Sequence, residues 1–189
     1  MRHGSETIRN IRGIMAVALV ATAEALCQER QTDSHIPVED PTPQRRIVVS
    51  IPDRKLAVIE NDRVVRIFET AVGAPHSPSP TGTFRIVNSI EHPTWYTKGR
   101  TVPPGPANPL GTRWLGLSQK GYGIHGTNVP ASIGKNASHG CIRMRNHDVE
   151  QLFKMVAVGD TVELIGERTD EIAKIFTPVT VVAADDNNN

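Results

Sequence analysis

Short runs of β-branched and other apolar residues, separated by turn-forming residues, limit the fold of this chain more than any other feature. Such runs occupy residues 47–51, 55–60, 64–68, 83–87 and 161–165. They are too short for typical helices, and Val, Ile and Phe favour extended backbone. The segment Asn61-Asp62-Arg63 separates two of the runs with a turn composition. We therefore expect successive antiparallel strands.

One stretch near the C-terminal end has the spacing of an amphipathic helix. Its apolar residues are Val149, Leu152, Phe153 and Val156. Asn146 is predicted to cap this helix, because an Asn side chain satisfies free amides at a helix start. Asp148 and Glu150 lie in the first turn, where negative side chains are favoured. We expect the helix to pack on the sheet.

The stretch at 88–121 is rich in Pro and Gly and lacks helical spacing. Long irregular loops are predicted there, and loops of this length are often functional. The stretch holds three large aromatic residues, Trp95, Tyr96 and Trp114. They either wall a cleft or pack in the core, and the sequence leaves both possibilities open.

The N-terminus has the organisation of a secretory signal peptide. Arg2, Arg9 and Arg12 precede an apolar run at 14–21, and small residues follow it. The run is shorter than the ~20 apolar residues of a membrane-spanning helix. We predict export to the periplasm or cell envelope, with an N-terminal anchor as the alternative. Residues 1–27 are assigned to this segment, 28–44 to a polar linker, 45–166 to one folded domain, and 167–189 to a C-terminal extension and polar tail.

Composition excludes some classes of function. The formal net charge of +1 gives no electrostatic reason to expect nucleic-acid binding. Cys27 and Cys141 are the only cysteines, which is too few for a disulfide scaffold and lacks the paired spacing of a zinc site. No glycine spacing typical of nucleotide or flavin binding is present, so no cofactor is expected. No obligate protein partner is inferred.

A cysteine with histidines nearby indicates nucleophilic chemistry. The thiolate is the reactive form of Cys, and a neighbouring imidazole is needed to take the thiol proton near neutral pH. His139 lies two positions before Cys141, so both side chains share one face of an extended backbone. His125 lies sixteen positions upstream, far enough to approach from an adjacent strand. Gly126 and Gly140 leave backbone exposed beside these groups.

The segment Ser138-His139-Gly140-Cys141, with His125-Gly126-Thr127 upstream, resembles the motif of the L,D-transpeptidase family. Further similarity is found at Gly73, at 80–84 and at 108–111. The resemblance implies a mainly β fold, an antiparallel β-sandwich of the L,D-transpeptidase type with one or two short helices. It also implies that 45–166 is the catalytic domain.

The same resemblance implies a role for each motif residue. It makes Cys141 the nucleophile and His125 the base, with the Gly126 carbonyl orienting the imidazole. The amides of Gly140 and Cys141 would bind an oxyanion. The expected substrate-binding residues are Ser138, His139 and Arg143, and the guanidinium of Arg143 suits a peptide carboxylate. Arg145 is expected to lie at the surface.

The implied substrates are peptidoglycan stem peptides, and the implied inhibitors are carbapenems. Cell-wall biogenesis or remodelling would follow. The acyl acceptor stays open: a second stem gives a 3→3 cross-link, water gives carboxypeptidase activity, and a protein lysine gives anchoring. The alternatives are an L,D-carboxypeptidase or wall endopeptidase, and a wall-binding domain without catalysis. A metal site formed by His125, His139 and Cys141 is a further alternative.

Overall fold

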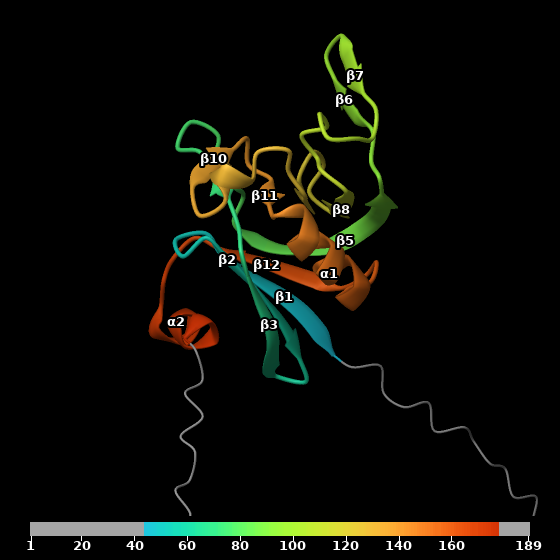
Figure 1. The fold of residues 1–189 in the computed structure, drawn as a ribbon. Helices are drawn as coiled ribbons and strands as arrows, with labels where there is room; N and C mark the ends of the chain where they lie inside the picture. Colours follow the sequence, from blue (N-terminus) through green and yellow to red (C-terminus); the bar gives the residue numbers. More distant parts are fainter. Residues whose placement is uncertain (1–43, 178–189) are drawn as a thin grey trace, which may run out of the picture. The chain divides into compact units, whose positions relative to one another are not determined.

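The computed structural model describes residues 44–177 (Figure 1). The signal segment predicted at 1–27, the linker as far as residue 43 and the polar tail from residue 178 lie outside this range. The described elements, in chain order, are β1 (Arg45–Ser50), β2 (Lys55–Glu60), β3 (Arg63–Glu69), β4 (Val72–Gly73), β5 (Gly82–Glu91), β6 (Trp95–Thr97), β7 (Arg100–Val102), β8 (Arg113–Leu117), β9 (Gly123–His125), a short 3-10 turn (Pro130–Ser132), β10 (Asn136–Ser138), β11 (Ile142–Arg143), α1 (Asn146–Met155), β12 (Thr161–Ile165) and α2 (Asp170–Phe176).

The main sheet has eight strands in the order β11-β9-β8-β5-β12-β1-β2-β3. The mainly β class is confirmed, whereas the expected antiparallel arrangement is wrong for part of the sheet. β12 runs parallel to β1, and β11 runs parallel to β9. In both cases the chain leaves the sheet and returns through intervening segments, which is the connection that parallel strands require.

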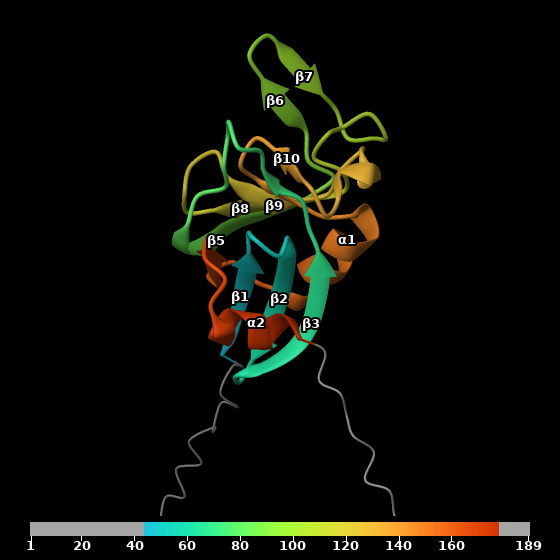
Figure 2. The ribbon, with the colours of Figure 1, turned by 90° about the vertical axis from the view of Figure 1, so that its left-hand side faces the viewer.

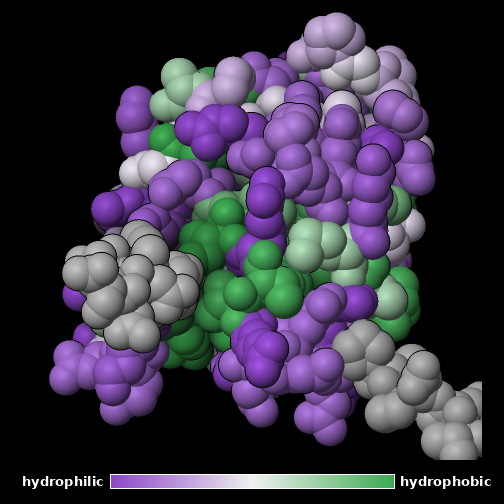
Figure 3. All heavy atoms as spheres, turned by 60° about the horizontal axis from the view of Figure 1, so that its bottom comes forward, coloured by the Kyte–Doolittle hydropathy of each residue, from purple (hydrophilic) through white to green (hydrophobic). Residues whose placement is uncertain are grey.

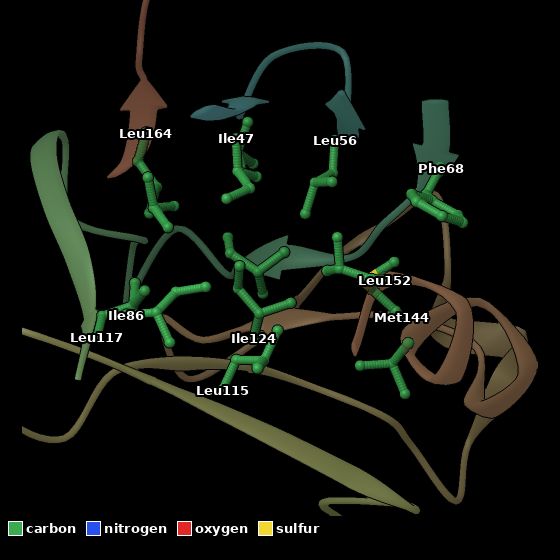
Figure 4. Packing of buried hydrophobic residues seen from close by; sticks show 14 of the residues in the cluster. Ile47, Leu56, Phe68, Ile86, Leu115, Leu117, Ile124, Met144, Leu152 and Leu164 are labelled. Atoms are coloured by element: carbon green, nitrogen blue, oxygen red, sulfur yellow. The ribbon is translucent and has the colours of Figure 1, made fainter. Parts of the chain in front are cut away.

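The two halves of this sheet face each other across the main core. Figure 4 shows Ile47, Leu56 and Leu164 opposite Leu115 and Ile124, with side chains from α1 closing one end. All of these side chains are buried. The eight strands form one hydrogen-bonded sheet that curls over its own core, in place of the two stacked sheets expected of a sandwich.

The opposite face of β1 and β2 is covered by α2, as Figure 2 shows. Phe176 of α2 packs with Val48 and Ala57 in a second apolar cluster. Both faces of β1 are therefore buried, which explains its nearly continuous apolar sequence. The Oγ1 atom of Thr169 accepts a hydrogen bond from the amide of Ile172 and caps α2. The prediction of only an extension after residue 166 missed this helix.

The stretch at 88–121 is more regular than expected. β5 continues as far as Glu91, and β6 and β7 form an antiparallel hairpin that projects at the top of Figure 1. β8 follows and pairs with β5 and β9. Two helices are described within 44–177, and neither is long and apolar enough to cross a membrane.

Candidate active site

The pairing of β9 with β11 brings the predicted site residues together. Ile124 pairs with Ile142, and His125 pairs with Arg143. Cys141 comes immediately before β11, and the parallel register places it beside Gly123 at the start of β9. A pocket of about 210 Å³ is formed there, and its lining includes the predicted residues His125, Ser138, His139, Cys141 and Arg143.

The imidazole of His125 is held in one orientation. Its Nδ1 atom lies 2.6 Å from the carbonyl oxygen of Gly126. A carbonyl oxygen only accepts hydrogen bonds, so Nδ1 carries the proton and donates it. Nε2 is then the unprotonated nitrogen of the neutral ring. This is the tautomer that a proton acceptor at Nε2 requires.

His125 is buried, with 4% of its surface exposed, and Trp114 is stacked on its ring. Burial lowers the pKa of His125 from its usual 6.5 to about 4. The carbonyl of Gly126 and the backbone of Leu110 act in the opposite direction, while the positive charge of Arg143 lowers the pKa further. The imidazole is therefore neutral at physiological pH.

Cys141 is partly exposed and forms no disulfide within residues 44–177. Its thiol donates a long hydrogen bond, 3.7 Å, to the carbonyl oxygen of Gly121. Burial raises the pKa of the thiol, while the backbone of Gly123 and the charge of Arg143 lower it in part. Because burial is the largest influence, the resting site holds a neutral thiol beside a neutral imidazole.

The Ser138 hydroxyl organises the backbone around Cys141. Its Oγ atom donates to the carbonyl oxygen of Cys141 over 2.5 Å and accepts from the amide of Gly140 over 3.0 Å. Gly140 has a φ of +105°, and a side chain there would meet the ring of Tyr122. The Gly140 amide thus donates to Ser138 in this structure, and its expected role as an oxyanion donor stays a prediction.

Arg143 reaches the pocket from β11. Its backbone amide and carbonyl both bond to Ala71, each over 2.8 Å, which fixes the strand. Its Nε atom is buried without a hydrogen-bond partner, and none of the ion pairs found within 44–177 includes this residue. A cation that lines a pocket without an acidic partner suits an anionic ligand. Arg145, by contrast, is exposed and lies 3.6 Å from Asp148.

His139 and the aromatic residues border the cleft. His139 is exposed and lies edge-on to His76, with ring centroids 6.4 Å apart. A second depression of about 400 Å³ adjoins the first and is lined by Trp95, Tyr96, Trp114 and Cys141, among others. The aromatic residues therefore wall the cleft. Cys141 lies between the two depressions.

Sequence reasoning missed Leu110 and Pro109, which line the pocket, and Asn146, which contacts the backbone beside His125. Asn146 was expected to cap α1, but the capping position is occupied by Arg145, without a side-chain hydrogen bond. The similarity noted at 108–111 was the one signal that pointed to Pro109 and Leu110.

The described residues form neither a metal site nor a second catalytic site. Within 44–177, no group of three or more His, Cys, Asp or Glu side chains is arranged to hold a metal ion. A separate groove of about 370 Å³ lies between β3 and α2, but its lining of Val64, Val65, Ile67 and Ile175 with Arg66, Lys174 and Thr177 has no nucleophile paired with a base. Figure 3 shows apolar surface on this side of the molecule.

The fold and the site define a class of proteins in which a curled β-sheet carries a cysteine and a buried histidine at the ends of neighbouring strands. The sequence model of one protein family, the L,D-transpeptidase catalytic domain YkuD, matches residues 44–164. The chain belongs to this family.

Individual relatives agree with this assignment. The Bacillus licheniformis protein YkuD is 44% identical over 119 residues, which are 63% of this chain and 64% of that protein. The Bacillus subtilis protein YqjB is 39% identical over 130 residues, or 66% of this chain and 73% of that protein. This chain thus spans less than two thirds of the Bacillus licheniformis relative.

Solved structures show the same fold. An L,D-transpeptidase from Mycobacterium smegmatis superimposes with a TM-score of 0.56 at 22% identity, covering 66% of this chain and 59% of that chain. The Ldtfm-avibactam carbamoyl enzyme superimposes with a TM-score of 0.57 at 26% identity, covering 66% of this chain and 50% of that chain.

Proposed function

We propose that this domain is an exported L,D-transpeptidase that acts on peptidoglycan stem peptides through an acyl-thioester on Cys141. One observation carries the proposal. His125, with its Nδ1 atom held by the Gly126 carbonyl, lines the same pocket as the thiol of Cys141. A buried, oriented imidazole beside a thiol is the arrangement that activates a cysteine nucleophile.

In the first step the Cys141 sulfur attacks the carbonyl carbon between the L-centre and the terminal D-residue of a tetrapeptide stem. Nε2 of His125 takes the thiol proton as the carbon–sulfur bond forms. Both groups are neutral beforehand, so proton transfer accompanies the attack and no preformed ion pair is needed. The tetrahedral intermediate then collapses, and D-alanine leaves with the proton from His125.

In the second step an amine attacks the thioester carbonyl. His125 takes one proton from the amine, the carbon–sulfur bond breaks, and the Cys141 sulfur recovers the proton. The side-chain amine of diaminopimelate in another stem gives a 3→3 cross-link, and a protein lysine gives anchoring. Water in place of the amine gives a carboxypeptidase.

Backbone and charge support both steps. The amide of Cys141 is the proposed oxyanion donor, and the Gly140 amide joins it only if it leaves Ser138. Arg143 has no ion-pair partner within 44–177, and it is proposed to bind a stem carboxylate. His139 borders the bound peptide, and Ser138 holds the loop in place.

Two depressions share Cys141, which offers separate places for a donor and an acceptor stem. Carbapenems are proposed as inhibitors because they present a strained carbonyl to the same thiol. An L,D-transpeptidase among the structural relatives is solved in complex with imipenem. Export is proposed from the signal-like sequence at 1–27.

The test is incubation of purified disaccharide-tetrapeptides, of cross-linked dimers and of insoluble wall with the wild-type protein and with Cys141→Ala. Products are identified by mass analysis, and wall binding is measured by co-sedimentation. A transpeptidase gives a dimer formed with loss of D-alanine. A tripeptide without dimer indicates the hydrolase, and cleavage within an existing cross-link indicates an endopeptidase. Wall binding without any product, equal in both proteins, would mean a wall-binding domain and would refute the proposal.

A further inference from the structure

The side chain of Asn146 is turned toward the site and away from its own helix. Asn146 is the first residue of α1, which follows the strand that carries Arg143. The capping position before it is Arg145, whose side chain makes no capping bond. The Asn146 side chain is therefore engaged with other parts of the chain.

Its Oδ1 atom accepts hydrogen bonds from two backbone amides. The amide of Thr127 donates over 3.0 Å and the amide of Thr112 over 3.3 Å. Thr127 follows the strand that ends at His125, and Thr112 precedes β8. Because both partners are donors, the side-chain atom that faces them must be the oxygen and not the nitrogen.

One peptide group connects Asn146 to the imidazole. The amide of Thr127 and the carbonyl of Gly126 belong to the same planar peptide. Asn146 Oδ1 accepts from its N–H end, and its oxygen accepts from Nδ1 of His125 over 2.6 Å. A hydrogen bond at the N–H end polarises the peptide and makes its carbonyl a better acceptor, as in other hydrogen-bonded chains.

Two glycines make room for this contact. A Cβ atom added at Gly126 or at Gly111 would collide with Asn146 Oδ1. Gly111 also has a φ of +65°, a conformation that suits glycine. The motif glycine next to His125 therefore has a second purpose: it lets Asn146 reach the peptide that orients the ring.

We propose that Asn146 is a positioning residue that sets the tautomer of His125. It fixes the 126–127 peptide with its carbonyl toward Nδ1, which keeps the proton there and leaves Nε2 free to accept the thiol proton. The catalytic consequence of this inference rests on the proposed role of His125 as the base. The effect of Asn146 on the His125 tautomer does not depend on that role.

The first test reads the tautomer directly. Nitrogen-15 NMR of histidine-labelled protein at neutral pH distinguishes a protonated ring nitrogen from an unprotonated one, and His125→Gln identifies the His125 signals. We expect the proton on Nδ1 in the wild type, and a loss of this single tautomer in Asn146→Ala. Asn146→Asp retains an oxygen acceptor at the same place and should restore it.

The second test measures acylation of Cys141 by a carbapenem. We expect Asn146→Ala to lower the rate by about 10- to 100-fold, the effect of mutating the hydrogen-bond partners that orient metal-ligating histidines in the same way. Asn146→Asp should recover most of the rate. His147→Ala is the matched control, since His147 is the next residue of α1 and is exposed, and it should behave as the wild type.

The proposal is overturned if the wild type carries its proton on Nε2. It is also overturned if Asn146→Ala keeps the Nδ1 tautomer, whether or not its melting temperature falls. If Asn146→Ala does not fold, Asn146→Ser is measured with the same expectations, because its shorter side chain falls away from the Thr127 amide. Failure of the proposed function is distinguishable: the wild type would then form no adduct, whatever its tautomer.

Discussion

Trp114 is stacked on His125, with ring centroids 5.8 Å apart and ring planes inclined by 24°. The indole covers one face of the imidazole, and its Nε1 atom is anchored by a 3.0 Å hydrogen bond to Asn88. The stack contributes to the burial that lowers the pKa of His125 to about 4. The neutral base of the proposed mechanism thus depends on a residue outside the motif.

Trp114→Leu should raise the pKa of His125 from about 4 toward its usual 6.5, because water regains access to the ring and stabilises the charged form. An NMR titration of the His125 ring measures this pKa. Tyr96→Leu is the control, since Tyr96 is 74% exposed and is not stacked on the imidazole. An unchanged His125 pKa in Trp114→Leu would show that the stack does not govern its protonation.

Buried neutral His125 should make the fold less stable in mild acid. Between pH 6.5 and 4 the unfolded chain binds a proton at this position and the folded chain does not, so stability is lost as pH falls through this window. Well below pH 4 the lowered pKa corresponds to a loss of about 3 kcal/mol in the free energy of unfolding. Denaturant unfolding at pH 7.5 and 4.5 should show a smaller acid loss in His125→Gln than in the wild type. Equal losses would contradict the lowered pKa.

The charge of Arg143 should tune the reactivity of Cys141. The thiol pKa is raised by burial and partly lowered by Arg143, so alkylation by iodoacetamide should rise about tenfold per pH unit between pH 7 and 9, without a plateau. Arg143→Gln should slow alkylation at each pH, because the thiolate loses a nearby positive charge. Arg145→Gln should not, since Arg145 is exposed and close to Asp148.

The alkylation experiment is performed with Cys27→Ser as the background, and the modified peptide is mapped by mass spectrometry. A rate that levels off below pH 7 would indicate a preformed thiolate and contradict the neutral pair. If Arg143→Gln and Arg145→Gln slow alkylation equally, Arg143 acts on the thiolate only through the general surface charge, which would contradict the prediction.

Local sequence signals predicted individual strands well, but not the way the strands are assembled. The β-branched runs correspond to β1, β2, β3, β5 and β12. Nothing local in β12 indicates that it inserts between β5 and β1 and runs parallel to β1. That position depends on pairing with β5, 76 to 82 positions earlier in the chain, and with β1, 115 positions earlier, and a propensity argument does not include these contacts.

Two missed elements did leave signals. Thr169 followed by Asp170 and Glu171 is a typical helix start, and it begins α2. Lys98-Gly99 lies between two short runs that form the β6–β7 hairpin, and Gly99 has a φ of +74°. In the site, the motif placed Cys141 and His125 in one pocket. The contact of Asn146 with the Thr127 amide joins segments nineteen residues apart and was not visible in the sequence.

A carbapenem should acylate Cys141 and leave a stable adduct. Its strained lactam carbonyl is open to attack by the thiol as His125 takes the proton, and the acylated site persists without a strong amine acceptor. Intact-protein mass spectrometry should show one added drug mass on the peptide that contains Cys141. A penicillin should react less productively, as the family resemblance implies.

Two variants separate the roles in this reaction. Cys141→Ala should form no adduct at all, while its melting temperature stays close to that of the wild type, because the residue is partly exposed and its side chain is small. His125→Ala should still form the adduct, but about 10²- to 10⁴-fold more slowly, which is the usual contribution of a general base. Cys27→Ser should match the wild type. A folded wild-type protein that forms no adduct, or an adduct that persists in Cys141→Ala, would remove Cys141 from the proposed mechanism.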